Sequence, residues 1–177
     1  MIMGRTARRA TLTAHVAVSV GWFGAVAVSL VLGVVGLLDR DPEVVRAVWL
    51  SLALVGWWAL VPLSLLSLVT GLVQSLGSRW GLLRHYWVVV KLVLNLIATG
   101  VLLLYTQTLD TVADAARHAS TDTLSSGGLV DASPLVHSLA ALALLLGAIV
   151  LSIYKPTGLT GYGVRHEGNR AHRTATG

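Results

Sequence analysis

Apolar residues fill four long stretches of the chain, and polar residues collect between them. The four stretches are residues 12–38, 47–73, 86–109 and 134–154. An α-helix rises 1.5 Å per residue, so about 20 apolar residues cross the roughly 30 Å hydrocarbon core of a bilayer. We therefore predict an all-α membrane protein that forms a four-transmembrane-helix bundle.

The segments outside these stretches complete the predicted domain organisation. Residues 1–156 are expected to form one transmembrane domain, in which an outer loop over residues 110–133 joins the third and fourth spans. The first part of this region, residues 108–120, has a composition that allows it to extend the third helix. Residues 157–177 are rich in Gly, Thr and Arg, and we expect them to form a flexible cytoplasmic tail.

Composition agrees with a protein that resides in lipid. Hydrophobic residues make up 55% of the chain and charged residues only 12%, whereas a soluble domain carries about 25% charged residues. The chain has no cysteine, which excludes disulfides, thiolate metal sites and cysteine nucleophiles. Its net charge of +5 comes from short clusters beside the apolar stretches. That pattern is typical of membrane topology and not of nucleic-acid binding.

Basic residues are distributed unevenly between the two sides of the predicted bundle. With a cytoplasmic N-terminus, nine of them lie on the inner side and three on the outer side, while seven of the eight acids lie outside. Positively charged loops are retained in the cytoplasm. We therefore predict a multi-pass protein of the cell (plasma) membrane with both termini cytoplasmic. The inner basic residues are Arg5, Arg8, Arg9, Arg79, Arg84, Lys155, Arg165, Arg170 and Arg173.

Proline and tryptophan add local expectations. Pro62 lies inside the second span, where it removes a backbone hydrogen bond and is expected to kink the helix. Trp80 and Trp87 flank a predicted interface, where amphipathic rings settle. Trp57 and Trp58 lie deeper, and we expect them to fill packing space between helices.

Small residues recur every four positions along the first span, at Ala17, Gly21, Ala25, Ser29 and Gly33. Such stripes allow helices to approach closely in lipid. The stripe is therefore expected to form contacts within the bundle, or with a second copy or another membrane protein. The latter would suit a non-catalytic scaffold or accessory subunit.

Ionisable groups inside membrane spans are costly and mark functional sites. His15 and His85 fall at the same predicted depth near the cytoplasmic face, on different helices. Two neutral imidazoles placed in this way can ligate a haem iron from both sides. We therefore predict a b-type haem with a redox or haem-handling role, in which Lys91 meets a propionate. Alternatively, these histidines only hydrogen-bond water, lipid headgroups or neighbouring carbonyls.

A second functional hypothesis rests on the polar residues of the third span. Lys91, Asn95 and Thr99 are spaced four apart and share a helix face. Together with Gln74 they would line the path of a small-solute transporter or channel. The chain carries no nucleotide-binding loop and no nucleophile–base arrangement, so no catalytic residue is predicted.

The outer loop offers a candidate metal site. Asp110, Asp114 and His118 follow at successive spacings of four residues and would share one face of a helix. Carboxylate and imidazole groups bind zinc or copper(II). We predict Asp114, His118 and His137 as ligands on this side. A solvated acidic face would show the same pattern.

Three stretches of sequence carry a family resemblance. Residues 60–106, LVPLSLLSLVTGLVQSLGSRWGLLRHYWVVVKLVLNLIATGVLLLYT, and residues 137–163, HSLAALALLLGAIVLSIYKPTGLTGYG, resemble an uncharacterised family of small actinobacterial four-span integral membrane proteins. The opening HVAVSVGWFGAV resembles the first helix of copper-resistance D-type and bacterial cytochrome b membrane domains. In that resemblance His15, Trp22 and Gly24 match a histidine followed by a Trp-Gly-like pair. The first likeness implies the topology, and the second implies a haem environment for His15.

Overall fold

Long helices account for nearly all of the described chain. The computed structural model describes residues 3–77, 82, 85–129, 131–154, 158, 160 and 161. Most of the predicted tail, together with Trp80 and Arg84, lies outside the described residues. The elements are α1 (Arg5–Leu38), α2 (Pro42–Val55), the π-helical turn η1 (Gly56–Leu60), α3 (Val61–Gly77), α4 (Tyr86–His118), α5 (Thr121–Ser125) and α6 (Ser133–Tyr154).

The predicted all-α, four-span architecture is confirmed. Four helices are long and apolar enough to cross a membrane: Arg5–Leu38, Pro42–Gly77, Tyr86–His118 and Ser133–Tyr154. The second of these is continuous through α2, η1 and α3. No β-strand occurs among the residues that the structure describes. The chain is therefore a multi-pass helical membrane protein.

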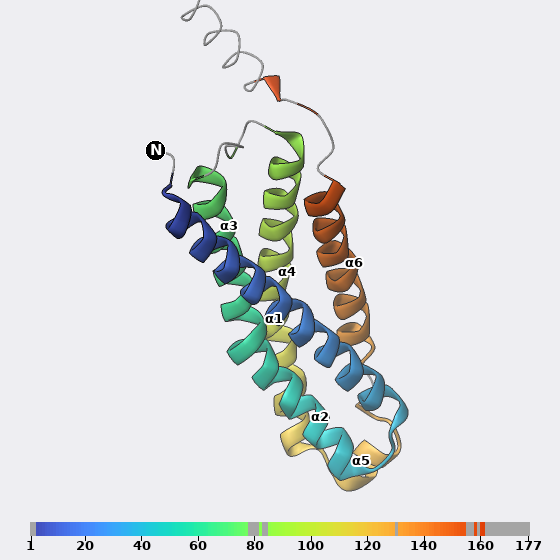
Figure 1. The fold of residues 1–177 in the computed structure, drawn as a ribbon. Helices are drawn as coiled ribbons and strands as arrows, with labels where there is room; N and C mark the ends of the chain where they lie inside the picture. Colours follow the sequence, from blue (N-terminus) through green and yellow to red (C-terminus); the bar gives the residue numbers. More distant parts are fainter. Residues whose placement is uncertain are drawn as a thin grey trace, which may run out of the picture.

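The helices form a bundle in which α1 crosses obliquely over the others (Figure 1). α1 packs against α3 near its start and against α2 and α6 further along, while α4 packs against α2, α3 and α6. Gly33 sets one of these contacts, because a Cβ at this position would stand 3.3 Å from the backbone nitrogen of Leu135 on α6. The second half of the small-residue stripe, Ser29 and Gly33, is buried in this bundle, while Ala17 and Gly21 remain exposed.

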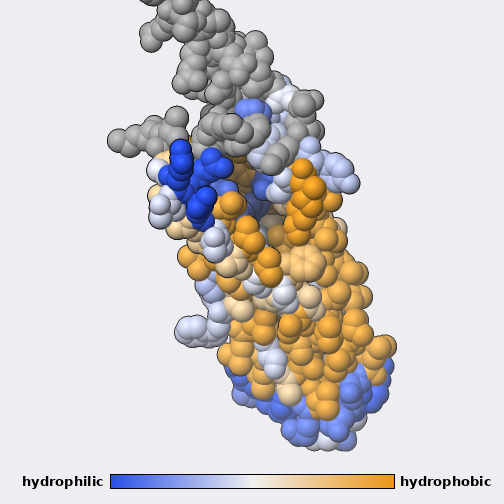
Figure 2. Space-filling model, viewed as in Figure 1, coloured by the Kyte–Doolittle hydropathy of each residue, from blue (hydrophilic) through white to orange (hydrophobic). Residues whose placement is uncertain are grey.

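The surface divides into an apolar belt and two hydrophilic ends (Figure 2). One end carries the exposed Arg5, Arg8 and Arg9 at the start of α1; we call it the arginine end. The opposite end carries Asp39 and Asp41 between α1 and α2, Glu43 in the first turn of α2, and Asp114 and Asp122; we call it the acidic end. Large apolar side chains are exposed between the two ends, as expected where lipid replaces water.

A separate apolar core, which we call the cap, lies at the acidic end. The helix Pro42–Gly77 has 36 residues and is roughly 54 Å long, whereas the hydrocarbon core measures roughly 30 Å. The helix of the third span, α4, continues beyond residue 109 and ends at His118, so the first part of the expected outer loop is helical. The projecting parts of α2 and α4 pack together with α5 around buried apolar residues. These are Val45, Val48, Trp49, Leu52, Ala53, Leu109, Ala113, Ala116 and Leu124.

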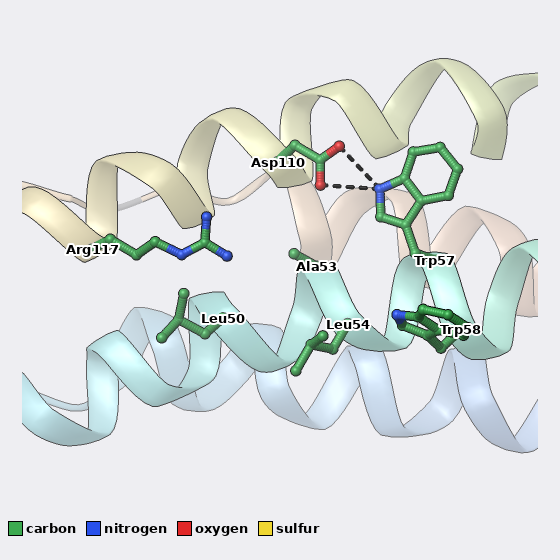
Figure 3. Close-up of a pocket in the computed structure, with 7 residues that line it drawn as sticks. All are labelled: Leu50, Ala53, Leu54, Trp57, Trp58, Asp110 and Arg117. Atoms are coloured by element: carbon green, nitrogen blue, oxygen red, sulfur yellow. Dashed lines mark hydrogen bonds between the residues drawn. The ribbon is translucent and has the colours of Figure 1, made fainter.

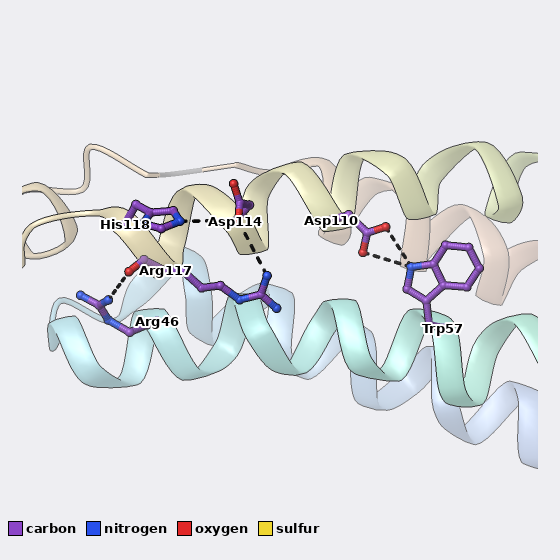
Figure 4. A network of polar contacts seen from close by, with 6 residues as sticks. All are labelled: Arg46, Trp57, Asp110, Asp114, Arg117 and His118. Atoms are coloured by element: carbon purple, nitrogen blue, oxygen red, sulfur yellow. Dashed lines mark hydrogen bonds and ion pairs between the residues drawn. The ribbon is translucent and has the colours of Figure 1, made fainter.

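Polar contacts order the helix ends in this cap. The Asp41 carboxylate accepts from the backbone N–H of Glu43 and caps the start of α2. Arg46 donates to the backbone oxygen of Arg117 at 2.9 Å, where α4 ends (Figure 4). It also donates to the backbone oxygen of Ala119 at 3.0 Å. These bonds satisfy carbonyl groups that a helix terminus leaves without intrahelical partners.

The distortion expected at Pro62 takes the form of the π turn η1. Proline has no N–H to give to the carbonyl four residues earlier, and its ring crowds that carbonyl. The π turn ends at Leu60, two residues before Pro62, and the N–H of Val61 donates to the carbonyl oxygen of Gly56. The expected packing role of Trp57 and Trp58 is wrong. They lie on this turn with 46% and 82% of their surface exposed, and they face outward at the lipid boundary.

Candidate functional site

Polar side chains from all four spans meet inside the half of the bundle nearest the arginine end. We call this group the arginine-end polar cluster. It comprises His15 and Ser19 on α1, Ser67 and Thr70 on α3, Lys91, Asn95 and Thr99 on α4, and Ser152 on α6. The predicted candidates His15, Lys91, Asn95 and Thr99 are therefore brought together, while Ser19, Ser67, Thr70 and Ser152 complete the set.

His15 is held against α3 in one defined tautomer. Its Nδ1 lies 3.0 Å from Thr70 Oγ1. The Thr70 hydroxyl donates its single proton to the carbonyl oxygen of Leu66 at 2.6 Å, so it can only accept from the imidazole. The proton of a neutral His15 is therefore on Nδ1, and Nε2 presents a lone pair.

Gly71 provides the space for this imidazole. A Cβ at Gly71 would stand 3.2 Å from His15 Cε1, which is tighter than ordinary van der Waals contact. A larger residue would therefore push the ring off α3 and disturb its bond to Thr70. Gly71 of α3 is therefore required for close packing against His15 of α1.

A hydrogen-bonded ladder continues from this point towards the middle of the bundle. Ser19 Oγ and Ser67 Oγ lie 3.3 Å apart, Asn95 Nδ2 donates to Ser67 Oγ at 3.4 Å, and Thr99 Oγ1 donates to Asn95 Oδ1 at 3.3 Å. Ser67 and Thr99 are only 3% and 4% exposed. Because buried polar groups must find partners in lipid, these residues satisfy one another across three helices.

Lys91 is the charged member of the cluster, and its partners are neutral. Its Nζ donates to Ser152 Oγ at 2.6 Å and stands 6.0 Å from the ring centroid of Trp87. Ser152 in turn donates to the carbonyl of Ala148 at 2.8 Å. Lys91 forms no ion pair with any described residue. The seven described acids all lie in two segments, from Asp39 to Glu43 and from Asp110 to Asp131, and neither segment contains a member of the arginine-end polar cluster.

A second polar group lies towards the acidic end, around Ser133. The Tyr105 and His137 rings stack with centroids 3.9 Å apart and 14° between their planes. His137 Nδ1 lies 2.8 Å from the Ser133 carbonyl oxygen, and Tyr105 Oη lies 3.0 Å from Ser133 Oγ. Ser133 Oγ itself donates to Asp131 Oδ2 at 2.7 Å, so it accepts from the tyrosine. One serine therefore orients both rings.

A cavity of about 190 Å³ opens beside these two rings. Its lining is apolar apart from His137, Tyr105, Ser138 and Ser29, and it reaches inward to the buried Trp22. The cavity lies between α1, α4 and α6, away from the arginine-end polar cluster.

A shallow groove of about 380 Å³ lies on the outside of α2 and α4 (Figure 3). Trp57 Nε1 donates to both carboxylate oxygens of Asp110 at 3.0 Å. Arg117 lies at the other end of the groove, opposite Leu50. The indole–carboxylate contact fixes Trp57 at the level where α4 leaves the apolar belt. Such amphipathic anchoring is typical of the membrane–water boundary.

The predicted metal ligands are not assembled into one group. Asp114 Oδ1 lies 3.8 Å from His118 Nε2 and also 3.8 Å from Arg117 Nη1, all on the exposed end of α4 (Figure 4). His137 instead stacks on Tyr105 inside the bundle. Among the described residues, no three His, Asp or Glu side chains are placed to hold a metal ion. The arginine competes for the same carboxylate, which favours the solvated-face interpretation.

His85 precedes the first turn of α4, and its ring centroid lies 6.5 Å from that of Trp87. These contacts do not test the predicted haem, which stays a prediction.

Ser19 and Ser133 were not predicted as site residues, although the sequence contains a weak signal for both. Ser19 follows His15 by four positions and Ser133 precedes His137 by four, the spacing that places side chains on one helix face.

Fold and site together define a multi-pass helical membrane protein with a polar cluster, including one lysine, inside its spans. Comparison with models of known protein families, with curated proteins and with solved structures returned no match for this chain. The resemblance to small actinobacterial four-span proteins stays a prediction.

Proposed function

We propose that this protein binds a small anion, or the anionic group of a larger ligand, at Lys91 in the arginine-end polar cluster. The observation that carries the proposal is the ammonium group of Lys91, which sits inside a span with a serine hydroxyl and an aromatic ring as its neighbours. Charged residues inside membrane spans are costly unless paired, and they mark ligand and ion pathways. An anion would supply the counter-charge that none of the described residues provides.

The surroundings of Lys91 favour access from the arginine end. Figure 2 shows the surface hollowed at this end, between the hydrophilic start of α1 and the apolar end of α6. Arg5, Arg8 and Arg9 are exposed beside it. Basic residues at the mouth of a low-dielectric cleft raise the local concentration of anions. The ligand would therefore pass these arginines before it meets Lys91.

The arginine end is proposed to face the cytoplasm, which supports an intracellular source for the anion. The chain has no cysteine, so single cysteines report topology without background. In intact cells, a membrane-impermeant maleimide is expected to label Ser125→Cys at the acidic end and to leave Thr6→Cys at the arginine end unlabelled. After lysis both should react. Labelling of Thr6→Cys alone in intact cells would reverse the orientation.

Anion-selective quenching of Trp87 tests the proposed function directly. Iodide, caesium and neutral acrylamide are added to the detergent-purified protein, and the same titrations of Trp87→Phe isolate the emission of Trp87. Each quenching constant is divided by the constant for free tryptophan, because iodide is intrinsically the more efficient quencher. This ratio is expected to be larger for iodide than for caesium, because the nearby Lys91 attracts anions. Equal ratios for iodide and caesium would contradict the proposal.

The predicted b-type haem is a second candidate for the same cluster. The lone pair on His15 Nε2 suits an axial ligand, since ligating imidazoles donate their other ring N–H to a fixed partner, here Thr70. Lys91 would meet a propionate, and a bound haem would supply redox chemistry. The protein purified after expression with ample haem is expected to show a Soret band that weakens in His15→Ala. A colourless protein would remove this candidate and leave the anion proposal standing.

A further inference from the structure

The cavity near the acidic end is independent of the Lys91 cluster. It contains the stacked pair Tyr105 and His137 and extends inward to Trp22 and Leu60. None of these residues belongs to the arginine-end polar cluster. Their arrangement has the features of small-molecule sites, namely a concave apolar lining with a few oriented polar groups.

The size of the cavity limits what it can hold. Its volume is about 190 Å³, and apolar cavities of about 150 Å³ hold one benzene molecule. The space therefore fits a single six-membered ring with small substituents. A macrocycle or a nucleotide is far too large for it.

His137 determines which polar group the ring should carry. Its Nδ1 faces a backbone carbonyl at 2.8 Å, and a carbonyl can only accept, so the ring proton of the neutral imidazole is on Nδ1. Nε2 then presents a lone pair, and it makes no hydrogen bond with any described residue. Stacking on Tyr105 holds the imidazole in place. A ligand must offer a donor, such as a hydroxyl group, to pair with Nε2.

The cavity is also open to lipid along one side. Val101 on α4 lines it and is 46% exposed, and Ala140 on α6 lines it and is exposed as well. Both belong to the apolar belt. A ligand with an apolar tail can therefore place its ring inside and leave the tail between α4 and α6 in the bilayer.

We propose that this cavity binds a membrane-soluble molecule whose head is a single hydroxylated ring, with the hydroxyl donating to His137 Nε2. The ring occupies the apolar space between Tyr105 and Trp22, and the tail passes Val101 and Ala140 into the lipid. The occupant is thus distinguished from an ordinary acyl chain by its hydrogen-bond donor.

Two matched probes test this assignment on the full-length protein in detergent. Radiolabelled 4-hexylphenol carries the donor, and 4-hexylanisole differs from it by a methyl group that removes the donor. We expect saturable binding of the phenol at one site per chain and about tenfold weaker binding of the anisole, the effect of one lost hydrogen bond to a buried acceptor. Equal affinity for the two probes would overturn the proposal and leave an unselective apolar cavity.

Variants locate the binding. His137→Phe keeps a ring to stack on Tyr105 but removes the acceptor, so it should bind the phenol no better than the anisole. Ala141→Phe fills the cavity and should abolish binding of both probes, while Leu139→Phe, on the exposed side of α6, should bind as the parent does. Unchanged phenol binding by His137→Phe would overturn the assignment. If Ala141→Phe does not fold, Ala98→Leu fills the same space from α4 and must weaken binding of both probes.

Discussion

Replacing Trp49 with alanine is expected to lower the free energy of unfolding by about 3–5 kcal/mol, the range for large aromatic residues lost from packed cores. Trp49 is only 1% exposed and belongs to the cap at the acidic end. It lies against Gly36 of α1, so the indole joins α1 and α2 as well as the cap core. The loss is measurable by titrating the purified protein with SDS in mixed micelles.

Two further tryptophan variants provide the controls. The Trp49 indole N–H is buried without an acceptor among the described residues, and an unsatisfied buried donor costs about 1–3 kcal/mol. Trp49→Phe removes that donor along with part of the ring, so it should be clearly less harmful than Trp49→Ala. Trp58→Ala, at an 82% exposed position, should change stability by less than about 0.5 kcal/mol. Equal losses in Trp49→Ala and Trp58→Ala would show that the cap does not stabilise the bundle.

Replacing Lys91 with methionine is expected to reduce iodide quenching of Trp87 by roughly threefold to tenfold. A unit charge about 8 Å from an anion is worth about 2 kcal/mol at an effective dielectric of 20, before salt screening. Methionine keeps an unbranched apolar stem of similar length, so packing against Trp87 is largely retained. The measurement is the iodide quenching constant, corrected with Trp87→Phe in the same background.

The charge effect must be separated from a change in access. Quenching by neutral acrylamide should be the same in the parent and in Lys91→Met, since only the charge has been removed. Lys91→Arg keeps the charge and should retain most of the preference for iodide over caesium. If Lys91→Met lost acrylamide and iodide quenching together, the lysine would act by holding the cleft open, and the anion proposal would fail.

The two proposed sites lie at different depths of the bundle and are expected to bind different ligands. The Lys91 cluster has a cation and faces the arginine end, whereas the His137 cavity has a hydrogen-bond acceptor and faces the lipid near the acidic end. At the first site the Thr70 hydroxyl sets the His15 tautomer and the Ser152 hydroxyl accepts from Lys91. At the second site the backbone carbonyl of Ser133 sets the His137 tautomer, and the Ser133 hydroxyl binds Tyr105. Short polar residues on helix faces are thus the elements that orient the functional groups.

The sequence by itself determined the architecture. Four stretches of apolar residues specify four spans, because lipid accepts only segments that satisfy their own backbone groups. The sequence of residues 108–120 also allowed the continuation of α4, which the structure shows as far as His118, since helix formation is a local property. His15, Lys91, Asn95 and Thr99 stood out for a similar reason, because polar groups are rare inside spans.

Only the tertiary structure decided how these residues are paired. The outward direction of Trp57 and Trp58 depends on the π turn before Pro62, which shifts the helix face in a way that a regular periodicity does not show. The pairing of His15 with Thr70, and of His137 with Tyr105 instead of His118, depends on which helix faces meet. Contacts between residues 55 or 32 positions apart are set by helix rotation and crossing, and hydropathy along one chain does not encode either of them.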